Sequence, residues 1–417
     1  MPEKIVYAGV VSRSYQEAGA LVRRLAELPV PDKQVERLTR RIGGERVAER
    51  DADVKAFQEL PLAEKFGAPA GVTPPDLAVV MVDGGRLRIP DRGPPSAPPE
   101  AAAADAAAEV WEEEAAAKAG HWREDKVGLP VTMDGVVSEH DPCPEIPASF
   151  PDACRMPRLV RELKAGVKGA EDAAADADEP EVADQALREE AKYQPPEVVR
   201  RRVAASRVAW PAFAPPAATP AWTLGFQGAS RKAFVGDGSA NDWKLRRRFF
   251  GSFVPILDFI HALSYVFAAA MAGRKFGVGW ACYREWIAWV WQGQVARVIA
   301  ALDVRQRELG LPTKDEPETS PRQVVARTRT YLRNHADKMR YDEYRRQGLP
   351  IGSSLMESMV KQINRRVKGT EKFWSEEGSE AVLQPRADHL SDGEPLQAFW
   401  QRRQATATGQ RRYRRAV

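Results

Sequence analysis

The sequence has few cysteines and no long apolar segment. It holds three cysteines in 417 residues, and no pair has zinc-finger spacing. An odd, sparse set excludes a disulfide framework and favours a reducing, cytoplasmic compartment. The N-terminus lacks the apolar core of a signal peptide. The most apolar stretch, residues 253–273, contains Asp258 and His261, so it predicts a buried strand and helix and no membrane partner.

Charge is distributed unevenly along the chain. The formal net charge is only +4, which by itself indicates no class of partner. From residue 321 to the end, however, 20 Lys and Arg stand against 11 Asp and Glu, a local net of +9. Such an asymmetry suggests a nucleic-acid-binding face on the C-terminal part of the chain.

Residues 10–50 predict two amphipathic helices. Ser14 and Glu17 form a capping box at the start of the first helix, and Asp32 can cap the second. A short break between two such helices fits a helix-turn-helix, and its candidate DNA contacts are Arg37, Arg40 and Arg41. The alternative is a plain helical hairpin whose basic side chains are solvated.

Short apolar runs alternate with polar, proline-rich stretches. Strands are expected at 77–82, 86–89, 126–133, 232–235 and 253–257. Proline, alanine and acidic residues dominate 90–120 and 168–221, which predicts flexible excursions. Residues 262–347 have a helical pattern and hold four tryptophans, for which packing in a core is a simpler role than stacking on DNA.

Three carboxylates stand out by their positions. Asp83 and Asp237 each follow an apolar strand and precede glycine, and Glu357 comes early in a helix that a Gly-Ser-Ser turn opens. Magnesium prefers carboxylate oxygens. Acids on two strands and a helix of a basic protein therefore suggest metal-dependent phosphoryl transfer on nucleic acid.

Each acid also has a purely structural interpretation. Asp-Gly pairs are common in hairpin turns, and Ser354 with Glu357 has the spacing of a capping box. Asp258 also ends a strand and competes with Asp237 as the second acid, whereas His261 beside it is most simply a core residue. Beyond Glu357, the same side of the helix carries Lys361, Asn364, Arg365 and Lys368, and this basic stripe favours an active site next to DNA.

Taken in order, these segments resemble the DDE transposases of bacterial insertion sequences, in the lineage related to Mutator-like elements. The matching segments are 82–85 (VDGG), 234–238 (FVGDG), 254–262 (VPILDFIHA), 344–358 (YRRQGLPIGSSLMES) and 368–374 (KGTEKFW). The resemblance implies an α/β fold: an RNase H-like mixed sheet flanked by helices, interrupted by an all-α insertion and preceded by a small helical segment. It also implies that Asp83, Asp237 and Glu357 bind Mg²⁺ or Mn²⁺ and catalyse strand cleavage and transfer, with Asp258 and His261 as an accessory signature.

The resemblance divides the chain and implies its partners. We expect DNA as element ends and target, a homo-oligomer on paired ends, and association with the nucleoid. Lys361, Arg365, Arg366 and Lys368 are the expected DNA contacts near Glu357. A nuclease without strand transfer and a catalytically inactive DNA-binding protein remain as alternatives. The expected regions are a helical DNA-binding segment at 1–60, the first part of the core at 75–261, the helical insertion at 262–347, the final core helix region at 348–400 and a basic flexible tail at 401–417.

Overall fold

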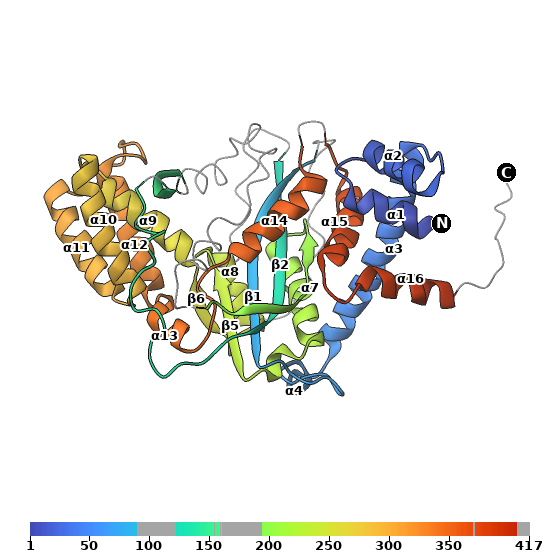
Figure 1. The fold of residues 1–417 in the computed structure, drawn as a ribbon, viewed down its shortest axis with the longest axis horizontal. Coiled ribbons are helices and arrows are strands. Elements are labelled where there is room, and N and C mark those ends of the chain that lie inside the picture. The colour runs from blue at the N-terminus through green and yellow to red at the C-terminus, as the bar shows by residue number, and fades with distance from the viewer. Residues whose placement is uncertain (90–121, 154, 159, 161–193, 370–371, 407–417) are drawn as a thin grey trace.

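A computed structural model describes residues 1–89, 122–153, 155–158, 160, 194–369 and 372–406 (Figure 1). A sheet lies at the centre of the molecule, a group of helices lies at one end, and the N-terminal helices lie at the other. The expectation of a mixed α/β fold with helices around the sheet is confirmed. None of the described helices combines the length and apolar character that crossing a membrane requires. The expected excursion at 90–120, residues 168–193 of that expected at 168–221 and the end of the basic tail lie outside the described residues.

The described strands form one six-stranded mixed sheet with the order β3-β2-β1-β5-β6, and β4 also pairs with β2. The pairs β1–β2, β2–β3 and β2–β4 are antiparallel, whereas β1–β5 and β5–β6 are parallel. The strands are β1 (Leu77–Arg88), β2 (Trp122–Asp134), β3 (Glu197–Arg201), β4 (Ala204–Ser206), β5 (Arg231–Gly236) and β6 (Val254–Leu257).

Strand β1 differs from the expectation of two separate strands at 77–82 and 86–89. It runs without a break through Asp83, Gly84 and Gly85, because each of these residues pairs with β2. The Asp83-Gly84 dipeptide is therefore not a hairpin turn.

The prediction of a flexible link was wrong for the described residues after 194. Residues 197–206 supply β3 and β4, and helix α7 (Trp210–Thr223) replaces the irregular segment expected at 209–221. Internal prolines remove helical hydrogen bonds. Burial of an apolar face against β2 compensates, since Phe213 and Ala217 are fully buried and Gly128 brings the strand close to them.

Residues 262–347 are mostly helical, as their sequence pattern predicted. Trp286 and Trp291 are buried, which confirms core packing for these two tryptophans. The helices of this region are α9 (Phe259–Met271), α10 (Phe276–Trp291), α11 (Val295–Leu309), α12 (Pro321–His335) and α13 (Tyr341–Arg346). Helix α8 (Ala240–Phe249) precedes them, between β5 and β6.

The N-terminal helices pack against the last helices of the chain. Ser14 caps the second of them, since its hydroxyl accepts a hydrogen bond from the Glu17 amide at 3.1 Å, as the capping box predicted. Asp32 begins the third helix but does not cap it, because the N-cap position is Pro31. The N-terminal helices are α1 (Pro2–Val11), α2 (Tyr15–Ala26), α3 (Asp32–Glu59) and the short α4 (Leu62–Lys65), and the last helices are α14 (Ser354–Val367), α15 (Glu376–Leu390) and α16 (Pro395–Ala405). Helices α1 and α3 contact α15 and share an apolar cluster with α16, and α14 bonds to α1. The first residues of the expected flexible tail thus belong to α16.

Candidate active site

The pairing of two parallel strands brings Asp83 and Asp237 together. Met81 of β1 is level with Val235 of β5, so two residues further along each strand Asp83 and Asp237 are neighbours. Adjacent strands lie about 4.8 Å apart, a distance over which two carboxylates interact strongly. The acids of two sequence segments more than 150 positions apart therefore meet at one point of the sheet.

Asp237 lies in a rigid turn. Its Oδ1 accepts a hydrogen bond from the Ser239 amide at 2.8 Å, and its carbonyl oxygen accepts one from the Tyr331 hydroxyl at 2.7 Å. Gly238 has a φ of +105°, and a Cβ there would lie 2.8 Å from the Tyr331 ring. Only glycine suits both conditions. The turn connects β5 to α8, so this Asp-Gly pair does not form a hairpin turn.

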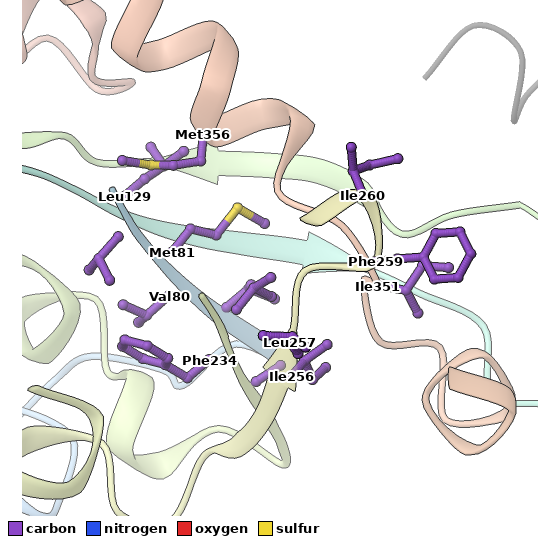
Figure 2. Close-up of a cluster of buried hydrophobic side chains, with 14 of the residues drawn as sticks. Val80, Met81, Leu129, Phe234, Ile256, Leu257, Phe259, Ile260, Ile351 and Met356 are labelled. Carbon is purple, nitrogen blue, oxygen red and sulfur yellow. The ribbon is translucent and has the colours of Figure 1, made fainter. Parts of the chain in front are cut away.

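Helix α14 carries the third acid across β1. Its apolar side, Met356, Met359 and Ile363, is buried, and Figure 2 shows Met356 pointing to the sheet above Leu129 and Met81. The N-cap is Ser353, with no side-chain cap hydrogen bond, so Ser354 is the first residue of the helix and not the cap that the capping-box alternative required.

The electrostatics of Asp83 link the three acids. Burial raises the pKa of Asp83 to about 7, and the charges of Asp237 and Glu357 add to this, against the hydrogen bond from the Gly84 amide. Asp237, just after β5, and Glu357, in the first turn of α14, therefore both lie within electrostatic range of Asp83 on β1. Their repulsion is the feature that a bound cation would relieve.

Asp242 is a fourth acid at this point, and sequence reasoning missed it. It lies in the first turn of α8 and is almost fully buried. Burial raises its pKa well above the usual range, and a hydrogen bond with Asp237 and the charges of Asp237 and Asp83 raise it further. The only sequence signal was its position three residues after the cap Ser239, which resembles an ordinary helix start.

Asp258 has a different environment from Asp237, and it follows β6 as expected. It is fully buried, accepts a hydrogen bond from the Ile260 amide at 2.7 Å, and binds both the amide and the hydroxyl of Ser353. Because these groups occupy its oxygens, Asp258 connects the start of α9 to the start of α14. This favours Asp237 as the second acid.

His261 adds a positive charge beside the acids. Its Nδ1 lies 3.5 Å from Oδ2 of Asp258. Burial alone would lower the pKa of His261, but the nearby carboxylates of Asp258, Asp237 and Asp83 raise it to about 10. His261 is partly buried, and the neighbouring carboxylates favour its protonated form.

The side chains expected to contact DNA differ in how far they are exposed. Lys361, Arg365, Arg37 and Arg41 are exposed, and Arg40 pairs with Glu36 at 3.1 Å. Lys368 is partly buried and acts electrostatically on Asp125.

Arg366 differs from the expectation, because its side chain is buried. Its Nε donates a hydrogen bond to the carbonyl oxygen of Gly9 at 2.9 Å, and its guanidinium lies 4.4 Å from the centre of the Tyr15 ring. Arg366 therefore fixes α1 and α2 to α14 and has no surface for DNA.

The donor set suits a hard divalent cation, since it consists of carboxylate oxygens. Within the described ranges, no three side chains of His, Cys, Asp or Glu are arranged tightly enough to hold a metal ion as they stand. An ion bound by these acids would require a different arrangement of their side chains. Neither a protein-family model nor a curated protein sequence matches this chain.

Proposed function

We propose that this protein is a DDE-type DNA transposase that cleaves and joins DNA by metal-dependent phosphoryl transfer. The observation that carries the proposal is that Asp237 and Glu357, from two distant segments, lie close enough to Asp83 to raise its pKa. The strand order β3-β2-β1-β5-β6, with three antiparallel strands followed by two parallel ones, supports the RNase H-like core that the sequence resemblance implies.

The chemistry follows from the residues present. Asp83, Asp237 and Glu357 would hold Mg²⁺ or Mn²⁺, and such ions activate the attacking oxygen and stabilise the leaving one. His261 lies 3.5 Å from Asp258 and, when protonated, would offset part of the negative charge of Asp83 and Asp237 before an ion binds. Asp258 in turn binds Ser353 and thereby fixes the first turn of the helix that carries Glu357.

The exposed basic side chains of α14 supply the DNA contacts in this proposal. Lys361 and Arg365 lie one and two helical turns beyond Glu357, at steps that keep them near one side of the helix. Phosphate contacts of this kind position a duplex without reading its sequence. A dimer or larger assembly would hold two element ends, and the protein would act at the nucleoid.

A strand-transfer assay tests the proposal. DNA carrying the sequences that flank the reading frame, either intact or nicked beforehand, is incubated with a target plasmid and Mg²⁺ or Mn²⁺. We expect cleavage of the intact ends, joining of the nicked ends, and loss of both with Asp83→Asn. The exposed Asp315→Asn is the matched control and should retain full activity.

Other outcomes assign the protein elsewhere. Cleavage without joining would identify a nuclease. DNA binding with no metal-dependent cleavage would identify a non-catalytic DNA-binding protein. If Asp83→Asn abolished DNA binding itself, Asp83 would only shape the fold.

A further inference from the structure

A second polar cluster lies beside the acids and is not explained by metal binding. Asp125 of β2 pairs in register with Gly85 of β1 and is fully buried. Among the described residues, neither oxygen of its carboxyl group has a hydrogen-bond partner in another residue, and Oδ1 of Asn364 on α14 is also buried and unpaired. Three acceptor oxygens without donors in one place require an explanation.

Gly85 shows that these two groups meet. A Cβ at Gly85 would lie 2.8 Å from both carboxylate oxygens of Asp125 and 3.0 Å from Oδ1 of Asn364. The missing side chain therefore leaves the space that the two polar groups share, on the side of the sheet that α14 covers. Any larger residue at position 85 would separate them.

The simplest way to satisfy this cluster is a hydrogen bond between its members. An unpaired buried carboxyl group costs several kcal/mol. The amide of asparagine has an acceptor on one side and two donors on the other, and half a turn exchanges them. We propose that Asn364 donates a side-chain hydrogen bond to Asp125, and that this link positions α14 over the strand that carries Asp83.

The hydrogen bond between Asn364 and Asp125 also affects the position of Glu357 relative to Asp83, and its effect on catalysis rests on the proposed function. Asn364 follows Glu357 by two helical turns and lies on the same side of α14. Gly85 follows Asp83 by two residues and lies on the same face of β1. The link and the Asp83–Glu357 pair are therefore neighbouring contacts between the same helix and the same strand.

The hydrogen bonds of Ser353 with Asp258 fix the first turn of α14, but its apolar contacts with the sheet do not fix the register of the following turns as strictly. They come from Met356, Met359 and Ile363, and apolar contacts are non-directional, with methionine the most adaptable side chain. A buried hydrogen bond has a preferred direction and length. Asp125 and Asn364 are thus positioning residues, which act on catalysis through Glu357.

A set of substitutions tests the link. Asp125→Leu and Asn364→Leu remove it, Asp125→Asn keeps it because two amides can bond each other, and the exchange of both residues (Asp125→Asn with Asn364→Asp) keeps it as well. The first readout is Mn²⁺ affinity by titration calorimetry, which a purely structural contact would not change. We expect the two leucine variants to bind Mn²⁺ about tenfold more weakly and the other two to bind like the natural protein.

The second readout is urea unfolding, which does not depend on function. If the link exists, the effects of Asp125→Leu and Asn364→Leu are not additive in the double variant. Additive effects, or unchanged Mn²⁺ affinity in a folded Asp125→Leu protein, would overturn the proposal. If Asp125→Asn weakened Mn²⁺ binding as much as Asp125→Leu, Asp125 would be an ion ligand and the positioning role would be wrong. If the natural protein bound no Mn²⁺, the proposed function would fail, and the unfolding data alone would decide on the hydrogen bond.

Discussion

Asp83→Asn should stabilise the metal-free protein, although it should abolish cleavage. The reason is that burial and the neighbouring acids raise the pKa of Asp83 to about 7, from an ordinary value of 3.8. Ionised Asp83 is therefore less favourable in the folded protein than in the unfolded chain. Asparagine has nearly the same shape and carries no charge, so it removes this penalty.

The size and the pH dependence follow from the two pKa values. Because the folded pKa lies above the unfolded one, the penalty is absent below about pH 4, grows between pH 4 and 7 and is constant above pH 7. The difference in pKa corresponds to at most about 4 kcal/mol. Asp83 is partly exposed, so solvent screening reduces the effect, and we expect about 2 kcal/mol at pH 8. For a chain of this length, 2 kcal/mol raises Tm by about 2 °C.

Scanning calorimetry in EDTA at pH 8 and pH 4 measures the effect, with the exposed Asp315→Asn as control. Asp83→Asn should have the higher Tm at pH 8 and no advantage at pH 4. Excess Mg²⁺ should raise the Tm of the natural protein at pH 8 and that of Asp83→Asn much less, since bound ligand stabilises only the form that binds it. An unchanged or lower Tm of Asp83→Asn in EDTA at pH 8 would refute the reasoning that burial and the neighbouring acids disfavour the ionised form of Asp83.

Three further predictions separate the roles of nearby residues. Asp258→Asn should lower the free energy of unfolding, measured in urea, by about 3 kcal/mol, because the buried pair of Asp258 with His261 is broken. Asp237→Asn should abolish cleavage and leave the free energy of unfolding unchanged or higher. The reverse pattern would exchange the roles of the two residues. Lys361→Ala should reduce the slope of log affinity for DNA against log salt by about one and affect all sequences alike; an unchanged slope would remove Lys361 from the interface. Gly238→Ala should cost about 1–3 kcal/mol of stability from its positive φ and its contact with Tyr331, and should lower the cleavage rate; full activity would show that this turn does not position Asp237.

Local sequence signals predicted many of the helices and strands and singled out three acids as candidate site residues. Ser14 and Glu17 marked the start of α2, and β-branched runs marked most of the strands. Asp83, Asp237 and Glu357 were recognisable because each lies at a characteristic place relative to an apolar run and to glycine or serine. Their meeting point, however, depends on the parallel pairing of β1 with β5, which no local pattern encodes.

The residues that sequence reasoning missed are those whose environment depends on distant partners. Asp125 lies between Glu124 and Lys126 and reads as part of a charged, exposed segment, yet strand pairing and α14 bury it completely. Arg366 belongs to a basic stripe and reads as a DNA contact, but α1 and α2 cover it. Helix α7 contains prolines that ordinarily break helices, and only its burial against β2 outweighs their cost. In each case tertiary packing overrides a correct local rule.

The most direct test of the central claim is an anomalous-scattering map of Mn²⁺-soaked crystals of the protein. The account predicts at least one manganese peak about 2.1–2.2 Å from carboxylate oxygens of Asp83 and Asp237, with Glu357 bound to the same ion or to a neighbouring one. Manganese found only elsewhere, or no peak between these acids at saturating Mn²⁺, would contradict it.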